Sequence, residues 1–175
     1  IAYLAAAAAD FVTESLIMAP GPLSLAAGVA LAATLSAGPR VWPALFLGAL
    51  LRMLFIGWET EVSVQVIAAT AGAAGITFGA VTAGGIVQRM VEALPPVERV
   101  ADLLVFFGFG AVLNGLIAGS VVTAGFSVVG LGDQLGGIWR VWFVSDFLGA
   151  LVFTPAILAW QFREGAPYSG ERREE

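Results

Sequence analysis

The chain has 175 residues, of which 59% are hydrophobic and 12% are charged, whereas about one quarter of a soluble domain is charged. This composition excludes an ordinary soluble domain and predicts an integral membrane protein, while the net charge of −5 argues against nucleic-acid binding, which needs a basic face. Because cysteine and histidine are absent, disulfides, imidazole or thiolate metal sites and Ser-His nucleophile pairs are excluded as well.

The first half of the chain holds four apolar stretches that predict membrane-spanning helices. The first covers residues 1–18 and is ended by Pro20-Gly21-Pro22, because proline cannot continue a helical hydrogen-bond ladder. The second, over 23–37, ends at a Gly-Pro-Arg turn, and the third, over 41–57, has a tryptophan at each end. The fourth, over 64–90, is rich in glycine, and Gly75 and Gly79 have the spacing that lets two helices approach closely.

Two further spans are predicted in the second half. A Pro-Pro loop precedes the fifth, over 100–124, where Gly115 and Gly119 form a second closely spaced pair of small residues. Such pairs more often pack within a chain than between chains. The sixth span, over 137–162, carries Trp139 and Trp160 near its ends, where amphipathic rings settle at the level of the lipid headgroups.

These stretches predict an all-α, polytopic membrane domain of about six helices over residues 1–163, followed by a polar tail or linker at 164–175. Six of the eight arginines would share the side of the two termini, so the positive-inside rule places both termini in the cytoplasm. The expected location is the inner membrane of a bacterium. The start at Ile1 in apolar sequence suggests a trimmed or processed chain.

Ionisable residues within the spans are the candidates for function, because a buried charge costs about 3 kcal/mol on insertion scales and must face protein or a cavity. Glu14 and Arg52 are each roughly one turn from the outer end of their spans, so an ion pair between them is expected, with Asp10 one turn from Glu14 on the same face. Asn114 and Asp146 are expected at comparable depth. Together these residues predict an outward-facing polar pocket.

Two residues of the sixth span extend this pocket. Trp142 lies one turn outside Asp146 and is expected to cover it, and Arg140 is a possible partner of that aspartate. The alternative is that these charges form structural pairs or face water at the rim. The sequence indicates no metal, and any cofactor stays unknown.

Several motifs resemble those of the first membrane-associated sensor (MASE) domain family. In the first half they are LAAGVALA at 25–32, GPRVWP at 38–43 and FLGA at 46–49; in the second half they are WRVW at 139–142, DFLGA at 146–150 and PAILAW at 155–160. Their order and spacing are similar and cover most of the chain. Ser145 departs from the family pattern, which commonly has glycine before the aspartate.

The resemblance implies a non-catalytic input domain of bacterial sensor histidine kinases and diguanylate cyclases, which senses a ligand or partner and signals through its helices to a cytoplasmic output module. Its partners would be the lipid bilayer and that module or other membrane chains, and not nucleic acid. Two other functions remain open at this point. The chain could be an accessory structural subunit of a larger membrane complex, or a small-solute-binding transport subunit with a similar six-span layout.

Overall fold

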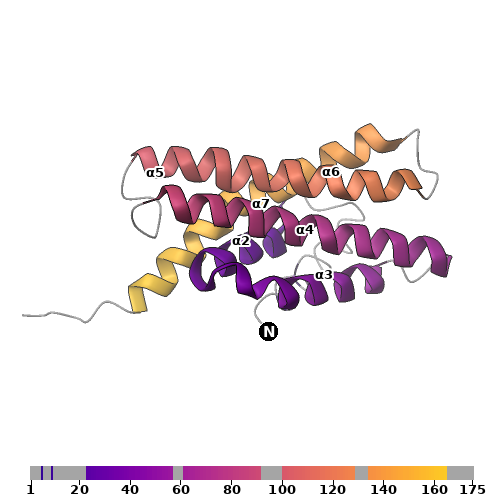
Figure 1. The fold of residues 1–175 in the computed structure, drawn as a ribbon, viewed down its shortest axis with the longest axis horizontal. Coiled ribbons are helices and arrows are strands. Elements are labelled where there is room, and N and C mark those ends of the chain that lie inside the picture. Colours follow the sequence, from indigo (N-terminus) through magenta and orange to yellow (C-terminus); the bar gives the residue numbers. More distant parts are fainter. Residues whose placement is uncertain are drawn as a thin grey trace, which may run out of the picture.

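The computed structural model describes residues 23–56, 61–91, 100–128 and 134–164, together with residues 5 and 9. These parts of the chain are almost entirely helical and contain no strand. The elements are α2 (Leu25–Ala37), the 3-10 turn η1 (Pro39–Val41), α3 (Trp42–Ile56), α4 (Val62–Met90), α5 (Val100–Val105), the π-helical segment η2 (Phe106–Val112), α6 (Leu113–Val128) and α7 (Leu135–Glu164). Figure 1 shows α5, η2 and α6 following one another as one long helix beside α4.

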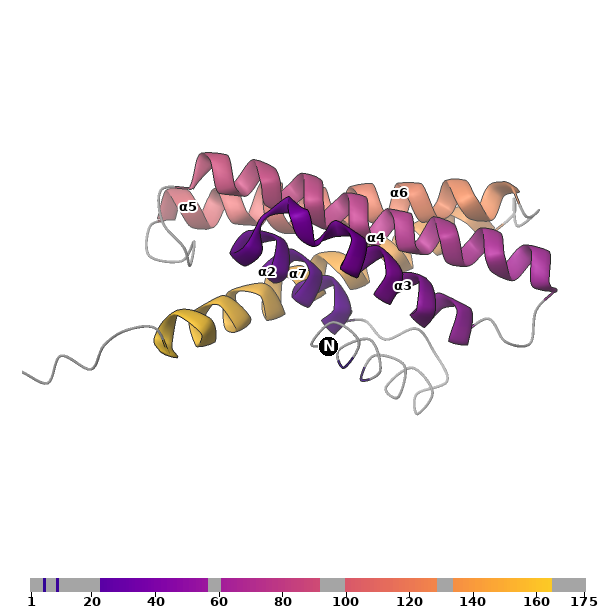
Figure 2. The ribbon, with the colours of Figure 1, turned by 60° about the horizontal axis from the view of Figure 1, so that its bottom comes forward.

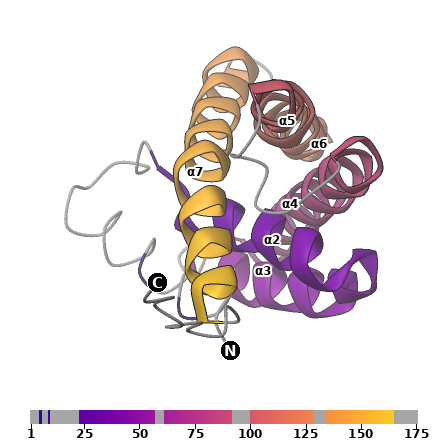
Figure 3. The same cartoon turned by 90° about the vertical axis from the view of Figure 1, so that its left-hand side faces the viewer.

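Neighbouring helices alternate in direction along the chain. Gln65 near the start of α4 donates to the carbonyl of Leu54 near the end of α3, so these two helices are antiparallel. The α4–α6 pair is also antiparallel, since Gly75 packs on Ala118 and Gly79 on Asn114. By contrast, α2 runs parallel to both α4 and α7, because its last turn is hydrogen-bonded to the last turns of these two helices. Figure 3 shows the bundle viewed from its end.

Local sequence fixes both ends of α2. The Ser24 hydroxyl accepts a hydrogen bond from the backbone N–H of Ala27 at 3.1 Å, which caps the first turn. At the other end Gly38 has φ +79°, a conformation that glycine adopts without steric cost, and its N–H donates to the carbonyl of Thr34 at 2.8 Å. Pro39 then starts η1, so α2 and α3 are joined by a very short turn.

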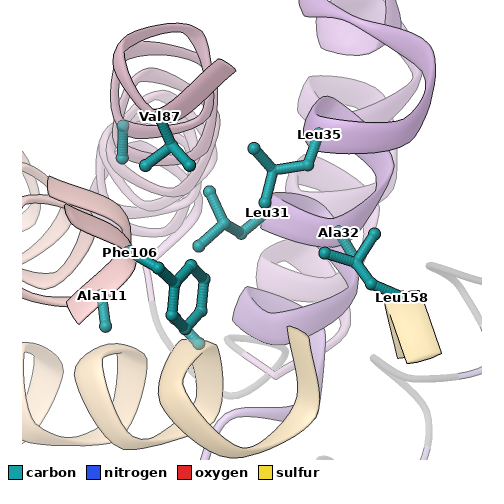
Figure 4. Packing of buried hydrophobic residues seen from close by; sticks show 9 residues of the cluster. Leu31, Ala32, Leu35, Val87, Phe106, Ala111 and Leu158 are labelled. Atoms are coloured by element: carbon teal, nitrogen blue, oxygen red, sulfur yellow. The ribbon is translucent and has the colours of Figure 1, made fainter. Parts of the chain in front are cut away.

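Two clusters of buried apolar side chains hold the bundle together. The first joins α2, α3 and α4 and consists of Ala26, Ala30, Leu45, Ala49, Ala73, Ile76 and Ala80. The second joins α2, α4, η2 and α7, and Figure 4 shows Phe106 and Leu31 lying in the space between these helices. Alanine dominates the first cluster, so the helix backbones there lie close to one another.

The glycines at the predicted small-residue spacing pack within the chain. A Cβ atom added to Gly75 would lie 2.9 Å from the carbonyl oxygen of Ala118, and one added to Gly79 would lie 2.8 Å from that of Asn114. On the adjacent side of α6, a Cβ at Gly115 would lie 2.9 Å from the carbonyl of Phe143 in α7. Both pairs therefore allow α6 to pack tightly on its neighbours.

The prediction of an all-α, polytopic membrane protein is confirmed. Within the described ranges, three helical stretches are long and apolar enough to cross a bilayer, namely Val62–Met90, Val100–Val128 and Leu135–Gln161, and they match the fourth, fifth and sixth predicted spans. The second and third correspond to α2 and α3, with 13 and 15 residues, where about 20 are needed for a full crossing. The predicted span over 1–18 lies outside the described residues.

Candidate functional site at the α2–α7 crossing

Helix α2 begins at mid-depth in the bundle. The backbone N–H of Ser24 donates to the carbonyl of Ser145, about a third of the way along the 30 residues of α7, at 3.2 Å. Ala26 packs in one cluster with Ile76, which lies at the middle of α4. Figure 2 shows α2 starting part-way along these two longer helices. The positive end of a short helix is therefore located inside the bundle.

The backbones of α2 and α7 nearly touch at this point. A Cβ atom on Gly28 would lie 2.7 Å from the carbonyl oxygen of Gly149, and one on Gly149 would collide with the carbonyl of Ser24. Further along, the hydroxyl of Thr154 donates to the carbonyl of Gly28 at 3.0 Å. Two of the sequence stretches that resemble the sensor family, at 25–32 and 146–150, thus pack against each other.

Asp146 lies on the side of α7 that packs on α2. It precedes Gly149 by one helical turn and is only 2% exposed. Because helical side chains lean toward the N-terminus of their own helix, and α7 runs parallel to α2, its carboxylate is directed toward the level at which α2 starts. A carboxylate there is favoured by the dipole of α2, typically by about 0.3 to 1 kcal/mol and more when partly buried.

Arg52 lies on α3, at a similar depth along the bundle axis. It is half-buried and one turn from the end of α3. Its neighbour Met53 packs on Gly72 of α4, and Ala49, one turn earlier, belongs to the same cluster as Ala26. The start of α2, Asp146 and Arg52 therefore lie within a few helical turns of one another along the bundle axis.

Asn114 is also buried at this depth, with 2% exposure, but it belongs to a different interface. A Cβ on Gly79 would lie 2.8 Å from its side-chain oxygen Oδ1, so Asn114 packs on α4, whereas Asp146 lies on the face of α7 that packs on α2. The predicted grouping of these two side chains stays a hypothesis.

The two predicted residues near the start of α7 have separate environments. Trp142 is half-buried and packs against the cluster of Ala26 and Ile76, so it lies beside the candidate site. Arg140 is exposed. Asp10 and Glu14, and with them the predicted Glu14–Arg52 ion pair, lie outside the described residues.

Sequence reasoning missed a row of aromatic side chains on α7. Trp139 stacks on Phe143 with ring centroids 5.1 Å apart, Phe143 stacks on Phe147 at 5.9 Å, and Phe107 of η2 meets Phe147 edge-on at 5.6 Å. The indole N–H of Trp139 also donates to the hydroxyl of Ser120 at 3.2 Å. Trp139, Phe143 and Phe147 are four residues apart in the sequence, which places them on one face of a helix, and this spacing could have predicted the row. The row lies against Gly115 and Gly119 of α6.

Sequence reasoning also missed Asp102, which is 6% exposed in the first turn of α5. A carboxylate in the first turn of a helix is favoured by the helix dipole, which accounts for the position of Asp102 in an apolar stretch.

Sequence reasoning missed two glutamines as well. Gln88 donates to the carbonyls of Thr34 and Leu35 at 3.0 and 2.9 Å, and Ser36 donates to Gln161 at 2.7 Å. They connect the end of α2 to α4 and α7.

A comparison with known proteins supports the resemblance seen in the motifs. No curated protein and no solved structure matches the chain. The family model of MASE1, the membrane-associated sensor domain family, matches residues 3–169, which is nearly the whole sequence. The chain therefore belongs to the MASE1 family of membrane sensory domains.

Proposed function

We propose that this sensory domain has no catalytic activity of its own and binds a small polar ligand near the start of α2, with Asp146 as the principal contact. The observation that carries the proposal is a buried carboxylate at the level where a short helix begins inside the bundle. Buried ionisable groups and interrupted helices at membrane mid-depth are costly unless they serve binding or transport.

Arg52 and Ser24 complete the proposed site. A guanidinium supplies several donors in a fixed plane, a carboxylate supplies acceptors, and a hydroxyl can do either. These three groups together suit a ligand that carries both hydrogen-bond donors and hydrogen-bond acceptors. Asp10, Glu14 and Trp142 remain proposed members of the same pocket, and Asn114 and Arg140 are proposed only as its periphery.

Helix α7 is the proposed route by which binding reaches the output. It contacts the site at Ser145 and Gly149, is tied to α2 again through Thr154, and meets the end of α2 at the Ser36–Gln161 hydrogen bond. A ligand that binds one arrangement of this crossing more tightly than another shifts the population toward it. A small slide or rotation of α2 would then move the end of α7.

The proposed partner is a cytoplasmic signalling module or another membrane chain that receives this movement, and the proposed location is the bacterial inner membrane. The crossing favours this function over a purely structural subunit because its polar groups lie inside the bundle, whereas a subunit that only packs on a complex needs no such interior site.

The test uses Asp146→Asn, which preserves the shape of the side chain and removes its charge. A single cysteine introduced at Ala159, an exposed residue near the end of α7, carries a fluorophore, since the chain has no cysteine of its own. The full chain in lipid nanodiscs is titrated with amino acids, sugar phosphates and polyamines. We expect one of these classes to change the fluorescence of the wild-type domain, and Asp146→Asn to weaken that response at least tenfold while the melting temperature stays within a few degrees.

Thr154→Val serves as the matched control, because it removes a hydrogen bond of the same crossing without changing charge. It should lower stability by about 1 kcal/mol and leave the ligand affinity intact. If Asp146→Asn instead lowers the melting temperature and leaves every response unchanged, Asp146 is part of the scaffold and the proposed site is wrong.

A further inference from the structure

A groove on the outer surface of the bundle lies between α3 and α4, away from the α2–α7 crossing. It has a cavity volume of about 430 Å³ and is lined by Trp42, Phe46, Ala74, Thr77, Phe78 and Val81. Thr77 is polar but only 6% exposed, and the other described lining residues are apolar, so the accessible walls that they form are apolar. Trp42 and Phe78 form the outer edges and are 54% and 63% exposed.

The groove lies at the depth of lipid acyl chains. Helix α4 has 29 residues and is therefore about 43 Å long, which exceeds the roughly 30 Å of a hydrocarbon core by about one turn at each end. The lining residues Ala74 and Val81 extend from the middle of α4 toward its C-terminal end, over about 10 Å. The groove thus occupies one leaflet.

The end of this groove nearest the membrane surface is positively charged. Arg89 is exposed in the last turn of α4, and it continues the exposed side of the helix on which Phe78 and Thr82 lie. Arg40 is exposed in η1, two residues before Trp42, and η1 contacts α4. Gln88 binds the carbonyl of Leu35, which confirms that both arginines lie at the same end of the bundle.

We infer that this groove binds one anionic glycerophospholipid, with an acyl chain between α3 and α4 and the phosphate near Arg40 and Arg89. Gly85 lies between the groove and Arg89, and a Cβ added there would meet no atom of the described residues within 4 Å, so no described part of the chain blocks the path that the lipid would follow. Guanidinium groups recognise phosphate through two parallel hydrogen bonds, and Trp42 is suited to the interfacial level between chain and headgroup.

Charge also decides between a lipid and a second copy of the chain as the occupant. In a symmetric dimer within a membrane, both copies place the same end at the same surface. Packing this face on itself would bring two Arg40 and two Arg89 side chains together, and their repulsion disfavours the pair. An anionic headgroup neutralises them instead.

The test measures lipids retained by the full chain after extraction into mild detergent, with native mass spectrometry. Phosphatidylglycerol and phosphatidylcholine of identical acyl chains are added in equal amounts. We expect one phosphatidylglycerol to bind in preference to phosphatidylcholine. Arg40→Ala and Arg89→Ala should each weaken the binding of phosphatidylglycerol about fivefold, which is the effect of one cation near an anionic lipid surface.

Matched variants distinguish the effect of losing a positive charge from the effect of disturbing the fold. Arg40→Lys and Arg89→Lys should retain most of the preference, and Arg140→Ala, which removes an exposed arginine at the other end of the bundle, should leave it unchanged. Ala74→Phe fills the groove and should reduce the retention of both lipids, whereas Ala44→Phe adds the same ring on the exposed surface of α3 and should not.

Phe78→Ala removes one wall of the groove and provides a second test should Ala74→Phe fail to fold. Equal retention of the two lipids, or retention that none of the groove and arginine variants changes, would overturn the inference. A dimer that Ala74→Phe converts to a monomer, without a specific lipid, would assign the groove to a second copy of the chain.

Discussion

At the scale of single residues, the α2–α7 crossing depends on positions that have no side chain. Gly149 faces the backbone of Ser24, and Gly28 faces the backbone of Gly149, so each helix approaches the other where its own surface is bare. The nearby charge of Asp146 is held at a depth set by this contact. Packing and the candidate site are therefore coupled through the same few residues.

Gly149→Ala is expected to destabilise the domain by about 1 to 3 kcal/mol, because the added methyl group would overlap the carbonyl of Ser24 and force the helices apart. The unfolding free energy can be measured by denaturant titration in mixed micelles. Gly85→Ala is the control, since its methyl group would meet no atom of the described residues within 4 Å and should be neutral or slightly stabilising. Equal losses for both variants would show that the crossing is not tight.

At the scale of elements, hydrophobic runs and their Pro and Gly boundaries predict the helices well. The predicted stretches at 64–90 and 137–162 differ from α4 and α7 by at most two residues at either end. The mid-depth start of α2 was not predicted, because it depends on which carbonyl of α7 receives the N–H of Ser24. Hydropathy reports that a segment is apolar, but it does not report at what depth the segment begins.

The candidate site was predicted only in part for the same reason. Asp146 was recognisable as a charge inside an apolar span, and the structure buries it. The different packing of Asn114, against Gly79 of α4, follows from the rotation of α6 about its axis. That rotation depends on η2, where Leu113 donates to the carbonyl of Gly108 five residues earlier, and no sequence pattern marks such a segment.

The π-helical segment offers a prediction at this scale. A π turn contains about one residue more than an α turn, so deletion of Gly108 should convert η2 to α-helix while α5 and α6 keep their facing sides. A Cβ at Gly108 would meet nothing within 4 Å in the part of the chain that the structure describes, so little packing is lost there. We expect the melting temperature to stay within a few degrees.

Deletion of Gly119 is the control for that experiment. It lies in regular α-helix, and its loss would rotate the rest of α6 by about 100°, which moves the buried Val122 out of the core. Little folded protein is expected from this variant. If the Gly108 deletion is equally damaging, the wide turn is required for folding.

At the scale of the whole molecule, the bundle has two chemically different ends. Arg40 and Arg89 lie at one end, together with the exposed Trp160 of α7, whereas Glu61 and the exposed Arg140 lie at the other. Over the whole sequence, six of the eight arginines are predicted on the side of Arg40 and Arg89. Positively charged residues accumulate on the cytoplasmic side of membrane proteins. This asymmetry predicts that the arginine end, and with it the C-terminal end of α7, faces the cytoplasm.

Single cysteines at Glu61, Arg40 and Arg89 test this orientation in the cysteine-free chain. In intact bacterial cells, a membrane-impermeant maleimide should label Glu61→Cys and leave the other two unlabelled. All three should react once the membrane is permeabilised, which controls for access to the thiol. Because α4 joins Glu61 to Arg89 through one uninterrupted helix of about 43 Å, labelling of both from the same side would mean that α4 does not cross the bilayer. Labelling of Arg40 and Arg89 alone in intact cells would reverse the orientation, and the phosphate-binding end of the α3–α4 groove would then lie in the outer leaflet.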